Sequence, residues 1–135
     1  MMDIRRLADD FSVSAQISVQ DLQTLYDAGF RSIICNRPDG EDPGQPDAAE
    51  IAQVAHELGL EFAFLPAVTH DQLQGQAAKT RTLWEQLPKP VLAYCRSGTR
   101  CAVIWALLQI GQMPVDQIVE SAAKAGYDLS GMFAL

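Results

Sequence analysis

Short apolar runs alternate along the chain with longer stretches in which apolar positions recur every three or four residues. Most of the short runs have consecutive apolar residues, which is typical of strands buried on both faces, and the longer stretches have the period of amphipathic helices. The pattern predicts strands at residues 11–14, 31–36, 60–65 and 90–94. It predicts helices capped by Ser18 (with Asp21 as capping-box partner) and by Asp47, one between Asp71 and Leu87, one over 99–109 and one from Pro114 to Gly126.

Strands that alternate with helices indicate right-handed crossovers and parallel pairing. We therefore expect a single α/β domain, residues 1–135, with a mainly parallel sheet of four to five strands and helices on both faces. Ligands of such sheets bind beyond the carboxyl ends of the strands. The loops after Asn36, Leu65 and Tyr94 are expected to meet there.

The composition narrows the possible ligands. The chain has 135 residues, of which 48% are hydrophobic and 20% charged, which is enough for an ordinary core. Its formal charge of −7 excludes a general binder of nucleic acid or anionic membranes, because these need clusters of Lys and Arg. No apolar stretch reaches membrane length, and the first residues lack the apolar region of a signal peptide. We expect a cytoplasmic protein that concentrates positive charge wherever it binds an anion.

The cysteines and histidines do not form a metal-binding pattern. The 3 cysteines fit neither a zinc ribbon nor a CxxC redox site, and only 2 histidines are present. We expect free thiols in a reducing compartment, with no metal and no cofactor.

The segment Cys-Arg-Ser-Gly-Thr-Arg, residues 95–100, joins the most buried-looking strand to the most apolar helix. The strand places Cys95 at the edge of the sheet, and Gly98 lets the backbone turn with its N–H groups inward. The helix that starts near Thr99 adds its positive end, and Arg100 supplies a planar fork for two anion oxygens. The same field favours a thiolate at Cys95, which is a nucleophile near neutral pH. The alternative interpretation is an inert buried thiol beside solvated arginines.

Residues 94–100 resemble the signature loops of two enzyme classes. Protein-tyrosine and dual-specificity phosphatases carry Cys, two residues, Gly, two residues and Arg; Cys95 and Gly98 match, and Arg100 comes one residue early. Rhodanese-type sulfurtransferases carry a shorter loop, often Cys-Arg-Ser-Gly-x-Arg, and that match is complete. The Gly-His-Ile-Pro-Gly-Ala segment common upstream in rhodaneses is absent.

The rest of the chain looks like a phosphatase. Residues 13–17, residues 29–40 and the segment after the loop carry this likeness. Nearly the whole chain is similar to the bacterial phosphatase-like domain family of beta-lactamase-hydrolase-like proteins. The resemblance implies a compact fold like that of dual-specificity phosphatases.

The resemblance implies a cysteine-dependent phosphatase. In such an enzyme Cys95 would attack phosphorus and form a phosphocysteine, while Arg100 and the loop amides would stabilise the equatorial oxygens. The substrate would be a phosphorylated small molecule or a phosphoprotein. The residues expected to bind it in the loop are Arg96, Ser97, Gly98 and Thr99.

The phosphatase reaction also needs a general acid for the leaving oxygen. In related enzymes this is an Asp on the loop after an earlier strand, and the matching loop here spans 66–71. Asp71 is the candidate and His70 the fallback, with Asp39 on the other rim as a second candidate. Asp71 has an alternative role as a helix N-cap, and His70 as a solvated loop residue. Ion pairs among Arg37, Asp39 and Glu41 would order this rim, unless they are only loop polarity.

Two other functions stay open. A rhodanese-like sulfurtransferase would carry a persulfide on Cys95, bind a sulfane-sulfur donor through Arg96 and Arg100, and need no general acid. A non-catalytic module would sense phosphate without turnover. The phosphatase is preferred because the likeness of the scaffold is longer than that of the loop.

Cys35 ends the strand expected beside the Cys95 strand. A Cys35–Cys95 disulfide would protect the nucleophile, since thiols of low pKa oxidise readily; the alternative is an inert buried Cys35. Cys101 is expected to pack in the helix.

Overall fold

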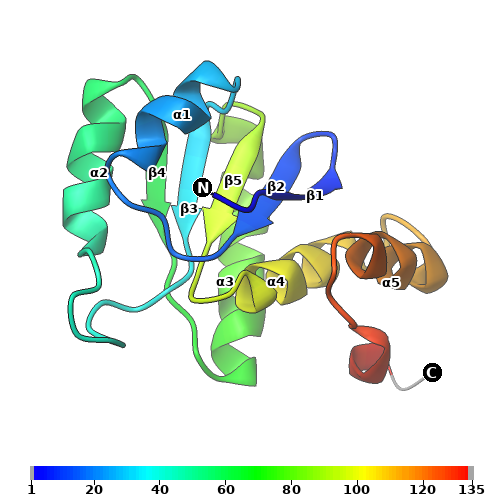
Figure 1. Ribbon diagram of the computed structural model, residues 1–135. Helices are drawn as coiled ribbons and strands as arrows, with labels where there is room; N and C mark the ends of the chain where they lie inside the picture. Colours follow the sequence, from blue (N-terminus) through cyan, green and yellow to red (C-terminus); the bar gives the residue numbers. More distant parts are fainter. Residues whose placement is uncertain (1, 134–135) are drawn as a thin grey trace.

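The computed structural model describes residues 2–133 and contains one five-stranded sheet (Figure 1). The strands lie side by side in the order β1-β2-β5-β3-β4. The elements are β1 (Arg5–Ala8), β2 (Phe11–Ser14), α1 (Asp21–Asp27), β3 (Ser32–Cys35), α2 (Ala48–Glu57), β4 (Glu61–Phe64), α3 (His70–Leu83), η1 (Trp84–Gln86), β5 (Val91–Tyr94), α4 (Thr99–Gln109), α5 (Val115–Lys124) and η2 (Ser130–Phe133).

The strand pairing confirms the expected mainly parallel α/β sheet. β2, β5, β3 and β4 pair in parallel, and β1 is antiparallel to β2. The sequence pattern missed β1. Its sequence Arg-Arg-Leu-Ala buries only Leu7 among its four residues, so it carries too little apolar signal to be recognised alone.

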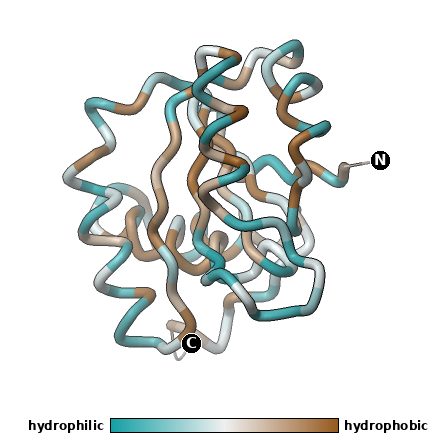
Figure 2. The backbone as a smooth tube through the Cα atoms, turned by 90° about the vertical axis from the view of Figure 1, so that its left-hand side faces the viewer, coloured by the Kyte–Doolittle hydropathy of each residue, from teal (hydrophilic) through white to brown (hydrophobic). Residues whose placement is uncertain are grey.

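Side chains alternate between two cores, one on each face of the sheet, because successive residues of a strand point to opposite faces. One core holds strand residues such as Ile33 and Leu92 with the inner faces of α1 and α2. The other holds strand residues such as Val13, Ile34 and Ala93 with α4 and α5. A third cluster packs α3 against α4. Helices therefore cover both faces, and hydrophobic colour follows the central strands in Figure 2.

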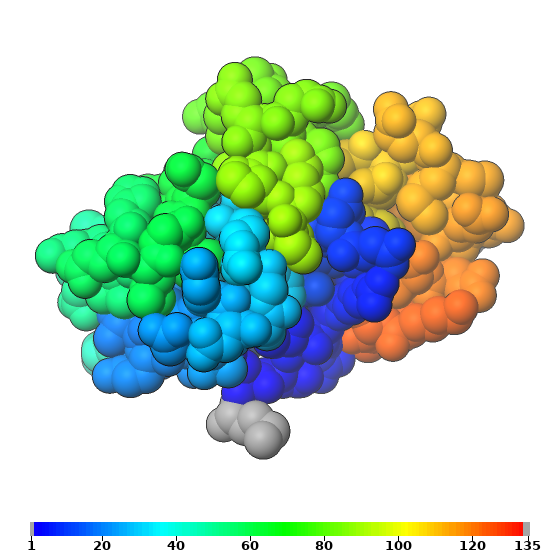
Figure 3. All heavy atoms as spheres, turned by 90° about the horizontal axis from the view of Figure 1, so that it is seen from above, coloured from blue at the N-terminus to red at the C-terminus, as the bar shows by residue number. Residues whose placement is uncertain are grey.

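The carboxyl ends of the strands meet at one end of the sheet, as expected from the alternating pattern. The backbone N–H of Cys95 donates to the carbonyl of Ser14 (3.3 Å), and that of Asn36 donates to the carbonyl of Tyr94 (2.9 Å). The Asn36 side chain also donates to the carbonyl of Leu65 (2.8 Å). Three loops are thus fixed to one another here. Figure 3 shows the opposite end, where the green segment before β5 lies between the blue turn of β1 and β2 and the chain that enters β3.

The start of the first helix differs from the prediction, whereas that of the second agrees with it. The first helix begins at Asp21, with Gln20 rather than Ser18 as its N-cap. Asp21 still accepts a hydrogen bond from the backbone N–H of Ser18 (2.9 Å), so half of the predicted capping box is present. Asp47 is the N-cap of α2, yet its side chain makes no capping bond.

The third helix begins earlier than the polar sequence suggested. Thr69 caps α3 and accepts from the backbone of Gln72, while the Gln72 side chain accepts from the backbone of Thr69. This reciprocal capping box fixes the first turn although the following sequence contains Gly75. Asp71 is therefore not the N-cap, and that alternative role is excluded.

None of the helices formed by the described residues is both long and apolar enough to cross a membrane.

Candidate active site

Cys95 follows the last residue of β5 and lies where the strand turns into α4. Its side chain is fully buried, in the core that includes α4. The side chains of Ala93 and Cys95 point to this face because they are two residues apart on an extended chain. The strand therefore delivers the sulfur to the start of α4.

Gly98 is the N-cap of α4 and adopts a left-handed conformation with φ +91°. Its N–H donates to the Cys95 Sγ (3.1 Å), so the turn aims a donor at the sulfur. A Cβ on Gly98 would lie 2.2 Å from the Tyr127 hydroxyl oxygen. That hydroxyl in turn donates to the carbonyl of Ser97 (3.2 Å). Glycine is required here both by the backbone conformation and by lack of space.

The surroundings of Cys95 favour its thiolate. Interaction with the neighbouring Cys101 thiol is the main cause that lowers the pKa of Cys95 to about 6. Backbone N–H groups of Cys101, Ser97 and Gly98 lower the pKa further, whereas burial opposes them. Burial, by contrast, raises the pKa of Cys101 well above its ordinary value. At neutral pH the pair is therefore a thiolate beside a thiol.

Cys35 does not lie on the same side of the sheet as Cys95. The register pairs Cys35 with Tyr94, and the two share the core beneath α1 and α2. Cys95, one residue later, points to the other core, and the Cys35 thiol donates to the carbonyl of Arg37 (3.2 Å). The structure does not support the Cys35–Cys95 pair considered from the sequence. The thiol beside Cys95 is that of Cys101.

Arg100 lies in the first turn of α4 and reaches across the carboxyl ends of the strands. Its Nη1 donates to the carbonyl of Ala67 (3.1 Å), and its Nη2 donates to Glu41 Oε1 (2.9 Å). A guanidinium has five N–H groups, so donors remain for an anion in the loop. Burial lowers the pKa of Arg100, but the hydrogen bond to Glu41 and the nearby negative charges raise it, and the net change is a rise.

The rim expected from Arg37, Asp39 and Glu41 is ordered in part by ion pairs. Arg37 Nε donates to Glu41 Oε1 (2.8 Å), and Arg37 Nη2 donates to Asp42 Oδ2 (2.7 Å). Asp42 Oδ2 lies 3.6 Å from Arg96 Nε. Asp39 has another role, because its Oδ1 accepts from the backbone N–H at the start of α2 (2.8 Å).

The three candidate general acids, Asp71, His70 and Asp39, lie at the end of the sheet that carries the 95–100 loop. They differ in the hydrogen bonds that their side chains make. Asp71 and His70 are exposed in the first turn of α3, directly after the segment whose carbonyl binds Arg100. The His70 ring contacts the side chain of Gln74 (3.2 Å). The Asp39 carboxylate is held by a hydrogen bond at the start of α2. The Asp71 carboxylate makes no hydrogen bond or ion pair with the other described residues.

The remaining loop residues are open to solvent. Arg96, Ser97 and Thr99 are exposed, and the hydroxyls of Ser97 and Thr99 lie 3.1 Å apart.

Sequence reasoning named these loop residues, but it missed the contacts of Asp42 and Tyr127 and the influence of Cys101 on Cys95. Only the last of these had a local signal, a second cysteine in the helix that follows Cys95.

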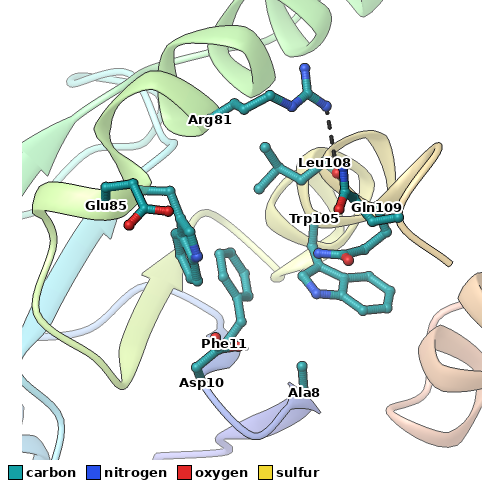
Figure 4. A pocket seen from close by; sticks show the side chains of 10 residues that line it. Ala8, Asp10, Phe11, Arg81, Glu85, Trp105, Leu108 and Gln109 are labelled. Atoms are coloured by element: carbon teal, nitrogen blue, oxygen red, sulfur yellow. Dashed lines mark hydrogen bonds between the residues drawn. The ribbon is translucent and has the colours of Figure 1, made fainter.

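A cavity of about 330 Å³ lies away from this loop (Figure 4). It is formed by the turn between β1 and β2, by η1 and by the second half of α4, with Phe11, Trp84 and Trp105 among its walls. It contains no residue of the 95–100 loop. Within residues 2–133, no group of three His, Cys, Asp or Glu side chains is placed to hold a metal ion.

The chain matches known proteins along most of its length. The sequence profile of the family described as "Beta-lactamase hydrolase-like protein, phosphatase-like domain" matches residues 3–112. The Beta-lactamase hydrolase-like protein of Agrobacterium fabrum is 28% identical over 126 residues, which are 92% of this chain and 29% of that protein. The chain therefore spans about 30% of the length of the curated relatives that it matches.

Solved structures share the fold. The "putative phosphatase" of Neisseria meningitidis Z2491 is 37% identical, with a TM-score of 0.84 over 96% of this chain and 92% of that one. PTPMT1 is 18% identical, with a TM-score of 0.73 over 95% of this chain and 85% of that one, and shows a likeness of fold alone. The match to the profile, the chemistry of the 95–100 loop and the shared sheet agree. The chain belongs to the phosphatase-like domain family of beta-lactamase hydrolase-like proteins.

Proposed function

We propose that this protein is a cysteine-dependent phosphatase that hydrolyses phosphate monoesters, of a small molecule or of a phosphoprotein. The observation that carries the proposal is the Cys95 sulfur, which has a pKa of about 6 and lies under the Gly98 N–H in the turn between β5 and α4. The first turn of α4 adds the Arg100 fork next to it. A thiolate below backbone donors and a guanidinium suits attack on a tetrahedral dianion.

In the proposed reaction the Cys95 thiolate attacks phosphorus. An S–P bond forms, the P–O bond to the leaving group breaks, and the electron pair of that bond stays on the leaving oxygen. The Gly98 N–H, which donates to the buried sulfur, holds the thiolate in place for this attack. Water then cleaves the S–P bond, which releases inorganic phosphate and restores the thiolate.

We propose Asp71 as the acid that protonates the leaving oxygen. Its support is that Asp39, the other candidate aspartate, is held by the N–H of Ala48 at the start of α2. Asp71 lies at the start of α3, close in sequence to Ala67, whose carbonyl binds Arg100. His70, beside it in the same turn, is the fallback.

Asp71→Asn is expected to lower kcat for an alkyl phosphate about 100-fold, because the poor leaving oxygen then departs unprotonated. For an activated aryl phosphate, such as 4-nitrophenyl phosphate, we expect a smaller loss, since that leaving group needs little protonation. Asp39→Asn is the matched control. It should lower the melting temperature through α2 and leave the ratio of the two rates unchanged. Equal losses on both substrates for Asp71→Asn would contradict its role.

A rhodanese-like sulfurtransferase is the second candidate. The observation in its favour is the short loop, in which Arg100 follows Gly98 after one residue rather than two. In that reaction the Cys95 thiolate would attack the outer sulfur of a donor such as thiosulfate, and sulfite would leave with the electron pair of the broken S–S bond. Cys95 would keep the sulfur as a persulfide and pass it to another thiol or to cyanide. Arg96 and Arg100 would bind the donor anion.

The covalent adduct on Cys95 separates the candidates. After reaction with an aryl phosphate and acid quenching, we expect intact mass spectrometry to show one phosphoryl group on Cys95, with release of phosphate in the steady state. After incubation with thiosulfate we expect no gain of one sulfur. A sulfur adduct with cyanide-dependent thiocyanate formation and no phosphate release would establish the sulfurtransferase instead. Binding of phosphate with neither adduct would indicate the non-catalytic sensing module.

A further inference from the structure

Arg37 is a buried arginine at the carboxyl end of β3, and nothing in the proposed reaction uses it. Its exposed fraction is 3%, and all three of its side-chain nitrogens donate. Nε donates to Glu41, Nη2 to Asp42 and Nη1 to Gln16 Oε1 (3.0 Å). A buried guanidinium with each nitrogen bonded has one orientation, so it is a fixed point at the rim.

Each carboxylate bound by Arg37 also contacts one arginine of the loop. Glu41 Oε1 accepts from Arg37 (2.8 Å) and from Arg100 (2.9 Å). Asp42 Oδ2 accepts from Arg37 (2.7 Å) and lies 3.6 Å from Arg96 Nε. Both arginines of the loop are therefore connected to one buried arginine through one carboxylate each.

The charges of this group explain why a third arginine is needed. Three arginines and two carboxylates leave one positive charge, which offsets the negative charge of the Cys95 thiolate in the same loop. Without Arg37 the charges sum to zero, and both carboxylates are left with only Arg96 and Arg100 as partners. An entering phosphate would then have to displace a carboxylate from each arginine. Arg100 also lowers the pKa of Glu41, so Glu41 stays ionised and keeps its hold.

We propose that Arg37 is a positioning residue that, through Glu41 and Asp42, orients Arg100 and Arg96 and keeps them available to the substrate's phosphate. The inference rests on the proposed function. It separates two contributions: Arg37 supplies the charge balance, which sets affinity for the anion, and Glu41 holds the Arg100 fork, which sets the rate of the chemical step.

The first test is a rescue by charge. Arg37→Met is expected to raise the Kd of inorganic phosphate, measured by titration calorimetry, about tenfold. Adding Glu41→Gln and Asp42→Asn to this variant removes the competing carboxylates and should restore the Kd to the wild-type value or below. The same triple variant should keep a reduced kcat, because Arg100 is no longer held. A purely structural role would leave both variants equally weak.

The second test avoids substitution of a buried arginine. Glu41→Gln keeps the size of the side chain, and we expect kcat on an aryl phosphate to fall about tenfold while the Kd of phosphate is unchanged or lower. Arg31→Met is the matched control for Arg37→Met. Arg31 lies at the amino end of the same strand and binds the carbonyls of Tyr26 and Phe30, so neither quantity should change.

The outcomes separate this inference from the proposed function. If the wild type binds no phosphate and forms no phosphocysteine, the proposed function fails. If the wild type does both, and Arg37→Met keeps the wild-type Kd or Glu41→Gln keeps the wild-type kcat, only the role of Arg37 is overturned.

Discussion

Cys95→Ser is expected to lower kcat on aryl phosphates by at least about 1,000-fold, because the variant replaces a thiolate with a hydroxyl that is neutral at pH 7. Backbone donors around the sulfur do not compensate, since they stabilise a charge that serine does not carry. Steady-state release of phosphate measures the loss. The variant should still bind inorganic phosphate, because Gly98 and Arg100 are unchanged, and its melting temperature should stay near that of the wild type. Substantial residual turnover would contradict the proposed role of Cys95 as the nucleophile.

The pH dependence of the same enzyme tests the state of the sulfur. With a pKa of about 6 for Cys95, the thiolate is present above that pH, so kcat/KM should rise as pH increases through about 6. Cys101→Ala removes the thiol donor that lowers this pKa the most, and the rise should move to higher pH. Cys101→Ser keeps a donor and should move it less. Cys35→Ala, on the other face of the sheet, is the matched control and should leave the profile in place.

Arg100→Lys is expected to reduce kcat about 100- to 1,000-fold while the charge of the site is retained. Lysine carries one ammonium, so it cannot hold the carbonyl of Ala67 and Glu41 and also offer a fork to the equatorial oxygens. The measurement is kcat and KM on an aryl phosphate, and the greater loss should be in kcat.

Arg81→Lys gives the control for this substitution. Arg81 is exposed near the end of α3 and donates to the carbonyl of Leu107 (3.1 Å), away from the loop. Its exchange should leave kcat unchanged. An Arg100→Lys variant as active as Arg81→Lys would show that charge alone suffices and that the fork has no role.

Most of the sheet could be predicted because the apolar pattern of a buried strand is local. Ile33 and Ile34 are adjacent and Leu92 lies between two apolar residues, and their strands are where the pattern places them. Helix starts were less predictable, since a backbone N–H can donate to any nearby oxygen. The N–H of Ala48 is bound by Asp39, nine residues away, rather than by the adjacent Asp47.

The arrangement of the 95–100 loop could also be predicted in part. Cys95, Gly98 and Arg100 are close in sequence, and a strand followed directly by a helix fixes how they lie together. The partners of the two loop arginines could not be predicted, because Glu41 and Asp42 come from a distant loop whose course depends on the buried Arg37.

By itself, the sequence determined the parallel α/β sheet and the strand-to-helix loop at residues 95–100, because both depend on residues that are neighbours in the chain. Only the tertiary structure decided which thiol accompanies Cys95. Register and the alternation of side chains place Cys35 on one face and Cys101 on the other, with Cys95. Folding likewise decided the partners of the loop arginines, because it brings Arg37 to the carboxylates of Glu41 and Asp42 beside Arg100 and Arg96.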